Sequence, residues 1–295
     1  MKIGMFFFKI FTLFLSWLPL RIIFIISDLL YIVLYRIVGY RTKVVRENLQ
    51  KSFPQKTIKE ILTIEKRFYH HLSDLTMETL LLPHITEKQI RKRCTFKNPE
   101  VINNQYNKGK SIICVMGHYG NWEMFSGFQL QSRHKVVALY KPLSNQQFDN
   151  YFKKMREKFG VETVSMADGM RVLLRYDRSK TMTLSLFIAD QAPTRDQSNF
   201  WTTFLNQDTA VFTGVERFAK KTNFPVIFLS MQKKSRGHYE VEAELLSDNP
   251  ESTTNFEITE AHTRVLEKHI QEQPEYWLWS HRRWKHKREN ITSEK

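Results

Sequence analysis

The beginning of the chain differs from the rest because it is almost entirely apolar. Phe, Ile and Leu dominate residues 5–35, where Lys9, Arg21 and Asp28 are the only charges. A membrane-spanning helix needs about 20 consecutive, mostly apolar residues. No run of that length here is free of charge, so the segment predicts a tilted membrane helix, or an interfacial helix or helical hairpin. We assign residues 1–38 to a membrane anchor and expect residues 39–295 to form one large domain.

After this segment, apolar positions recur first at helical and then at strand spacing. Residues 55–82 predict an amphipathic helix that stops at Pro83, and residues 86–93 predict a short basic one. Short apolar runs typical of buried strands follow at 111–116, 135–140, 161–166, 181–189, 225–231 and 239–246. Helical patterns lie between most of them, near 144–159, 168–178, 213–221 and 259–272, and another helix begins near residue 122. This alternation predicts an α/β fold with a mainly parallel sheet flanked by helices, whose site lies at the carboxyl ends of the strands.

The charge of the chain narrows the range of partners. There are 45 Lys and Arg against 30 Asp and Glu, a formal net charge of +15 at pH 7. Such an excess favours nucleic acid, an anionic membrane surface, or a phosphorylated or acidic substrate. Several cations closely follow the apolar segment, and by the positive-inside rule they put the large domain on the cytoplasmic side. They are Arg36, Arg41, Lys43, Arg46 and Lys51.

Cysteine and histidine usage gives no sign of a metal site. The only cysteines, Cys94 and Cys114, are spaced unlike a metal-binding pair, so we expect a reducing compartment and neither a disulfide framework nor a zinc thiolate site. His70 and His71 lie in the predicted helix 55–82 with Asp74 and Glu78 at helical spacing. Since a zinc site needs three convergent ligands, we interpret these four residues as the polar face of the helix.

The clearest candidate chemistry follows the predicted strand 111–116, in the sequence GHYGNWE at 117–123. A turn between His118 and Glu123 would let the carboxylate fold back onto the imidazole, giving a general base and the group that orients it. Gly117 and Gly120 remove bulk beside the histidine, and amides at the start of the next helix would hold an oxyanion or a phosphate. The alternative is a structural histidine, since such pairs also occur as ordinary hydrogen bonds.

Several ordered blocks resemble one known family, the late lipid A acyltransferases of the lysophospholipid acyltransferase superfamily. GHYGNWE is similar to the His-x4-Asp/Glu block of that family, and the resemblance extends over nearly the whole chain. The other similar blocks are REN and SFP within 46–54, LYKPLSN at 139–145, the long stretch 189–228, and PEYWLWSHRRWK at 274–285.

The resemblance implies a membrane-associated O-acyltransferase with a glycerolipid acyltransferase-like fold. Its reaction would move a fatty acyl group from acyl carrier protein to a hydroxyl of a lipid A precursor, at the cytoplasmic face of the inner membrane. His118 would be the general base and Glu123 its orienting carboxylate. No covalent acyl-enzyme, cofactor or metal is implied, and the sequence has no Gly-x-Ser-x-Gly nucleophile elbow.

Further residues are candidates for binding substrate. Gly117, Asn121 and Trp122 belong to the histidine block, and Asp190 and Gln191 end a predicted strand, where they would line the pocket or simply be satisfied strand-end groups. The cations Lys141, Arg156, Arg282 and Arg283 would bind lipid A phosphates or the acidic carrier protein, with Arg156 as the main phosphate ligand. A solvated role is open for Lys141. HRRWK is alternatively a structural tail in which Trp277, Trp279 and Trp284 pack on the domain or at the membrane interface.

Two rival functions remain at this point. The first is an acyltransferase that uses the same residues on another glycolipid, aminolipid or lysophospholipid. The second is a non-catalytic basic protein that binds anionic lipid at the inner leaflet. With a membrane segment and a histidine block present, we expect no nucleic-acid partner; an anionic membrane, a phosphorylated glycolipid acceptor and an acidic carrier protein would share one basic face.

Overall fold

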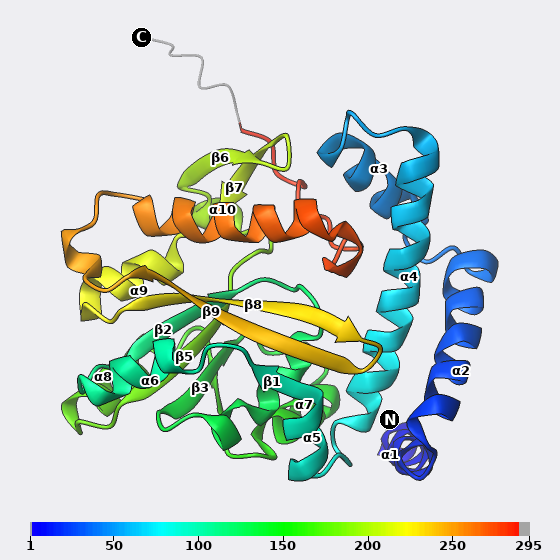
Figure 1. Ribbon diagram of the computed structural model, residues 1–295, viewed down its shortest axis with the longest axis horizontal. Helices are drawn as coiled ribbons and strands as arrows, with labels where there is room; N and C mark the ends of the chain where they lie inside the picture. The colour runs from blue at the N-terminus through cyan, green and yellow to red at the C-terminus, as the bar shows by residue number, and fades with distance from the viewer. Residues whose placement is uncertain (1, 289–295) are drawn as a thin grey trace.

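Helices cover both faces of a seven-stranded sheet in the computed structural model, which describes residues 2–288 (Figure 1). The strand order is β1-β9-β8-β2-β5-β3-β4, and every neighbouring pair is parallel except the long β8–β9 hairpin. β6 and β7 form a separate antiparallel hairpin. The strands are β1 (Cys94–Phe96), β2 (Ile112–Met116), β3 (Lys135–Tyr140), β4 (Glu162–Ser165), β5 (Thr183–Ile188), β6 (Phe200–Phe204), β7 (Gln207–Val211), β8 (Val226–Ser235) and β9 (His238–Ser247).

The helices form two layers that pack on opposite faces of the sheet. One core cluster holds buried side chains of α3, α4, α8, α9 and α10, and the other holds those of α5, α6, η2 and α7. The α-helices are α1 (Lys2–Ser16), α2 (Leu20–Tyr31), α3 (Thr42–Ser52), α4 (Ile58–Leu81), α5 (Glu87–Arg93), α6 (Glu100–Asn107), α7 (Gln146–Glu157), α8 (Gly169–Arg178), α9 (Gly214–Thr222) and α10 (Glu257–Glu272). A π-helical turn, η1 (Ile32–Ile37), extends α2, and the 3₁₀ helices are η2 (Trp122–Gln131), η3 (Arg195–Gln197), η4 (Pro250–Ser252) and η5 (Pro274–Tyr276).

The predicted α/β fold with a mainly parallel sheet is confirmed. β2 lies between β5 and β8 and is buried along its whole length, which explains its uninterrupted apolar sequence. Thr57 and Glu60 form a capping box at the start of α4, and Thr86 and Gln89 form another at the start of α5. The sequence pattern missed the short elements β1, α3 and α6, and the β6–β7 hairpin. The helix expected near residue 122 is a 3₁₀ helix.

The apolar N-terminal segment forms two helices instead of one: α1 ends at Ser16, and Pro19 directly precedes the first residue of α2. Among residues 2–288, no single helix has both the length and the apolar composition to cross a bilayer. Residues Leu20–Ile37 and Thr42–Ser52 meet these requirements only as a pair bent by 87°, and the apolar helix Gly4–Ser16 is shorter. The domain boundary at residue 38 stays a prediction, and residues 289–295 of the predicted large domain lie outside the described part of the chain.

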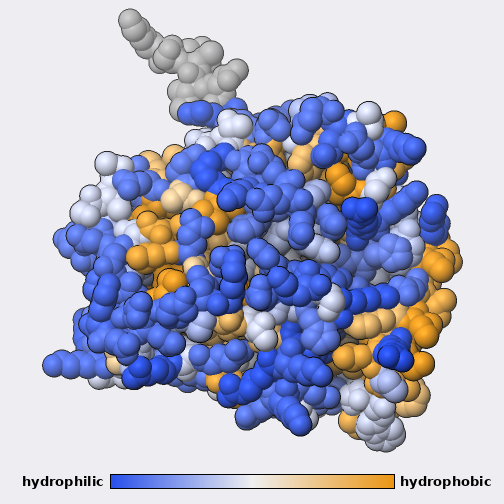
Figure 2. Space-filling view, in the orientation of Figure 1, coloured by the Kyte–Doolittle hydropathy of each residue, from blue (hydrophilic) through white to orange (hydrophobic). Residues whose placement is uncertain are grey.

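A polar cluster attaches α2 to the large domain. Ser27 donates a hydrogen bond to Asp74 Oδ1 of α4 at 2.7 Å, and Arg236 of the β8–β9 turn pairs with both Asp28 and Asp74. Figure 1 shows the end of this hairpin reaching α4, with α2 alongside. The opposite surface of α1 and α2 is exposed and apolar, and Figure 2 shows apolar side chains gathered at the edge of the molecule where these helices lie. Asp28 therefore pairs with the domain, and many Phe, Ile and Leu side chains of α1 and α2 face outward.

Candidate active site

The site begins where two neighbouring parallel strands end. The register pairs Met116 of β2 with Ile188 of β5, so the residues that follow these strands emerge side by side. His118 Nδ1 lies 2.7 Å from Asp190 Oδ1, and the His118 backbone N–H donates to Asp190 Oδ2 at 3.0 Å. From the C-terminal segment, Trp277 donates its indole N–H to the same Oδ2 at 2.8 Å. A buried carboxylate thus receives three hydrogen bonds, two of them from His118.

The ionisation of Asp190 determines the tautomer of His118. Burial opposes ionisation of Asp190, but the charge and hydrogen bonds of His118 and the indole of Trp277 outweigh it and lower its pKa to about 2. An ionised carboxylate only accepts hydrogen bonds, so His118 Nδ1 carries a proton, and in the neutral tautomer of the ring Nε2 carries the lone pair. Gln191 Nε2 lies 3.3 Å from that nitrogen and can donate to it. His118 therefore has an arrangement that suits a general base: Nδ1–H is held by a carboxylate, and Nε2 of the neutral ring is the accepting nitrogen.

The carboxylate that contacts His118 is not the one expected from the sequence. Glu123 instead accepts two hydrogen bonds from Arg156 of α7, the one from Nε being 2.9 Å long. Trp122 lies beside the imidazole, its ring centroid 4.8 Å away in an edge-on orientation. Successive side chains of a 3₁₀ helix diverge by about 120°, so when Trp122 faces His118 the next residue points elsewhere. The expected His118–Glu123 contact is therefore wrong, and Asp190, expected at the pocket, is the carboxylate that holds the imidazole.

The turn between β2 and η2 is held by close packing and buried polar contacts. Gly117 lies close to α10, since an added Cβ would be 2.8 Å from a terminal methyl carbon of Leu266, which would have to shift, and Gly120 has a left-handed φ of +67°. Asn121 is fully buried and donates to Glu78 Oε2 at 2.6 Å. Gly117 and Asn121 were both expected to bind substrate, but they pack against α10 and α4 and do not line the large cavity described below.

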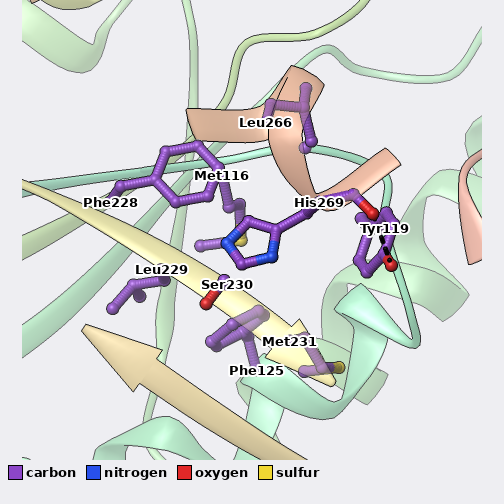
Figure 3. Close-up of a pocket in the computed structure, with 10 residues that line it drawn as sticks. Met116, Tyr119, Phe125, Phe228, Leu229, Ser230, Met231, Leu266 and His269 are labelled. Carbon is purple, nitrogen blue, oxygen red and sulfur yellow. Dashed lines mark hydrogen bonds between the residues drawn. The ribbon is translucent and has the colours of Figure 1, made fainter. Parts of the chain in front are cut away.

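Figure 3 shows the interior on the other side of this turn, where His269 and Leu266 of α10 lie near Met116 and Phe228. The Tyr119 hydroxyl donates to the carbonyl oxygen of His269 at 3.1 Å and ties the turn to α10. The cavity enclosed by these residues measures about 10 Å³, which is about the space of one water molecule and far too small for a substrate.

Polar residues of α4 contact the turn between β2 and η2. His71, Asp74 and Glu78 are buried, so the prediction that they form the polar face of the helix is wrong. His71 Nε2 lies 3.1 Å from the carbonyl oxygen of Gly120, and Glu78 accepts from Tyr239 as well as from Asn121. Only His70 is partly exposed, stacked on Tyr31. The reason is that α2 and the β8–β9 hairpin cover α4, and buried polar groups must then find partners.

A cavity of about 1400 Å³ opens at His118. Apolar side chains from β3, β5, η2, α8 and α9 form much of its wall. Of the residues expected at the site, His118, Trp122, Glu123, Lys141, Arg156 and Gln191 line it. The sequence interpretation missed His281, Arg217, Lys221 and Lys285, which also line it. Arg217 and Lys221 stand four residues apart on α9, a spacing that would have put both on one helix face.

The C-terminal block is mainly structural. Arg283 is buried and donates to the carbonyl oxygen of Ala210, and burial lowers its pKa to about 10. Trp277 and Trp279 are buried with their rings edge to face. Arg282 is exposed and does not line the large cavity. For these tryptophans and for Arg283, the alternative of a tail packed on the domain is confirmed.

The amides of the turn are largely engaged. The N–H of His118 binds Asp190, that of Gly120 binds the carbonyl of Tyr276, and that of Asn121 points to the Met231 sulfur. These three amides are therefore not free for an oxyanion, and the expected oxyanion or phosphate site at the amides that begin the next helix stays a prediction. Arg156, which pairs with Glu123, is one source of positive charge in the wall of the cavity that His118 lines.

The His118–Asp190 pair beside a large, mostly apolar cavity is an arrangement suited to acid–base chemistry on a substrate with apolar parts. A family model of bacterial lipid A biosynthesis acyltransferases matches residues 1–286. The chain therefore belongs to this family, as the motif resemblance indicated, and is an acyltransferase of lipid A biosynthesis. A comparison with curated protein sequences found no match.

Proposed function

We propose that this protein transfers a fatty acyl group from acyl carrier protein to a hydroxyl group of a lipid A precursor, with His118 as the general base. The observation that carries the proposal is the His118–Asp190 pair, in which the carboxylate holds Nδ1 of a histidine that lines the 1400 Å³ cavity. That volume exceeds the roughly 300–1,000 Å³ of ordinary small-molecule pockets, as expected for an acyl thioester and a lipid acceptor together.

In the proposed reaction, Nε2 of His118 takes the proton of the acceptor hydroxyl while the oxygen attacks the thioester carbonyl. Asp190 stabilises the imidazolium that forms, as a buried carboxylate does in other histidine-dependent acyl transfers. Collapse of the tetrahedral intermediate breaks the C–S bond, and the proton passes from His118 to the leaving thiolate. The products are an ester and a free carrier thiol, so the histidine ends neutral and no covalent enzyme intermediate forms.

Charged groups of the cavity wall support binding of an anionic substrate. Arg156 donates two hydrogen bonds to the Glu123 carboxylate, which leaves its remaining N–H groups for an anionic oxygen of the substrate. We therefore propose Glu123 as the residue that positions Arg156. Lys141 is exposed at the rim of the same cavity and is proposed as a second cation for phosphate or carrier protein.

We further propose that the protein binds the cytoplasmic face of the inner membrane through α1 and α2. Their outer surface exposes Phe7, Phe11, Phe14 and Trp17, and Ile25 and Leu29 continue it along α2. An interfacial arrangement suits two short helices docked on a domain. The net charge of +15 adds attraction to anionic lipid and to an acidic carrier protein.

The test is a product assay with purified, detergent-solubilised protein, acyl carrier protein thioester and a panel of acceptors that includes a lipid A precursor, another glycolipid and a lysophospholipid. A new ester on the lipid A precursor, detected by mass and lost in His118→Ala, is the expected result. An ester on a different acceptor would change the substrate assignment. No product with any acceptor would refute the proposed activity and favour a lipid-binding role, which co-sedimentation with anionic vesicles would reveal.

A further inference from the structure

The charges that line the large cavity are strongly unbalanced. Five cations face it, but Glu123 is the one carboxylate in its described lining. Glu123 is already paired with Arg156, so the other cations have no acid inside the cavity. The unpaired cations are Lys141, Arg217, Lys221 and Lys285. A mostly apolar cavity with this excess is suited to a substrate that is apolar along its chains and anionic at its head.

These cations come from two sides of the sheet. Lys141 and Arg156 belong to the β3–α7 region, and α7 packs on one face; Arg217 and Lys221 stand on α9, which packs on the opposite face. Lys285, from the C-terminal segment, also lines the cavity. The sequence interpretation assigned phosphate or carrier binding to Lys141, Arg156, Arg282 and Arg283, and nothing has been assigned to α9.

On α9, the cavity cations Arg217 and Lys221 differ from their neighbour Lys220 in their charge partners. Lys220 is satisfied: its Nζ lies 3.7 Å from Glu216 and donates to the carbonyl oxygen of Thr253 at 2.8 Å. Arg217 and Lys221 are exposed and form no ion pair within the described part of the chain. Like charges four residues apart on a helix repel each other, so an anion between them would remove an unfavourable interaction. An arginine beside a lysine also combines a planar fork with a point charge, both of which suit phosphate oxygens.

We propose that Arg217 and Lys221, with Lys285, bind a phosphate group of one of the two substrates at the α9 wall of the cavity. This proposal rests on the proposed function, under which both substrates carry phosphate. The acceptor is a phosphorylated glycolipid, and the thiol arm of the carrier protein is attached through a phosphodiester. The shared chemistry is a phosphate oxygen held close to the acyl-transfer site.

The experiment measures KM and kcat of the double variant Arg217→Ala/Lys221→Ala and of Lys285→Ala with the full-length protein in detergent. Four substrate pairs are needed: the phosphorylated or the dephosphorylated acceptor, each with either the carrier thioester or an acyl-N-acetylcysteamine thioester that lacks phosphate. The control is Lys59→Ala/Lys66→Ala, which removes the same charge from two exposed positions of α4 that do not line the cavity.

We expect the α9 double variant to raise one KM by about 10- to 100-fold while kcat changes little. If the rise disappears with the dephosphorylated acceptor, the phosphate is that of the glycolipid; if it disappears with the truncated thioester, it is that of the donor arm. A KM within twofold of wild type for both substrates, or an equal rise in the α4 control, would overturn the site. The proposed function would survive that result, since it fails only if His118→Ala keeps its activity or no product forms.

Discussion

Trp277 Nε1 donates a hydrogen bond to Oδ2 of Asp190, the carboxylate whose other oxygen holds His118. The indole comes from a segment almost 90 residues further along the chain. It is fully buried, and its ring packs on Trp279 and Trp284. One carboxylate thus joins the end of β5, the histidine turn and the C-terminal tail, so the tail acts on the geometry of the proposed general base.

Trp277→Phe keeps most of the ring but removes this N–H. Because a hydrogen bond to a charged group contributes about 1.5–3 kcal/mol, we expect kcat to fall by about 10-fold or more while KM stays near its wild-type value. Trp279→Phe is the matched control. It removes another buried indole N–H, which binds the carbonyl oxygen of Pro274 and does not touch Asp190. Equal losses of kcat in both variants would mean that Trp277 is only a structural residue.

The sequence predicted the sheet and the position of the histidine but not its partner. The length and periodicity of apolar residues are enough to predict a buried strand such as β2, because an apolar run reflects the burial of that strand alone. The partner of His118 depends on which strands become neighbours, and His118 and Asp190 are 72 positions apart. The pattern His-x4-Glu suggested a local pair, yet the 3₁₀ geometry of η2 turns Glu123 toward Arg156. The burial of His71 and Glu78 was equally hidden, since it depends on α2 and the β8–β9 hairpin covering α4.

The two carboxylates of the site should respond differently to neutralisation. In Asp190→Asn, the amide no longer fixes the tautomer or stabilises the imidazolium, and we expect kcat to fall by about 10³–10⁴-fold, as for the matching change in other histidine-based sites. Glu123→Gln leaves the His118–Asp190 pair intact, so we expect a smaller loss and an acidic limb of the pH–rate profile at the wild-type position. The measurement is kcat/KM between pH 5 and 9. A displaced acidic limb in Glu123→Gln would restore Glu123 as the orienting residue.

The partnership of Glu123 and Arg156 gives an independent check on this assignment. If Glu123 acts by positioning Arg156, then Glu123→Gln and Arg156→Lys remove the same interaction. The double variant should therefore be little worse than the more damaged single variant. Fully additive losses in kcat/KM would show that the two residues act separately.

Buried histidines make the fold sensitive to mild acid. Burial lowers the pKa of His71 to about 3 and that of His262 to about 4, both from 6.5. Between those values and 6.5 the unfolded chain binds protons that the folded chain does not, so stability is complete above about pH 6.5 and decreases as pH falls. His71→Gln keeps a donor for the carbonyl of Gly120 and cannot titrate. As the pH falls, we expect the unfolding free energy of His71→Gln to decrease less steeply than that of wild type. The two slopes should differ by up to about 1.4 kcal/mol per pH unit. Parallel curves from pH 6.5 to 4 would contradict the buried, neutral state of His71.

The docking of α2 should depend on one arginine. Arg236 connects Asp28 of α2 to the buried Asp74 of α4, so Arg236→Ala removes the link and leaves Asp74 with Lys233 and Ser27. Because Arg236 is about one-third exposed, we expect a modest loss of about 1–2 kcal/mol in unfolding free energy. Amide hydrogen exchange in residues 20–31 should also become faster. Lys234→Ala is the control, since it breaks an exposed pair with Glu240 on the same hairpin. Unchanged exchange in residues 20–31 of Arg236→Ala would show that apolar packing alone holds α2 on the domain.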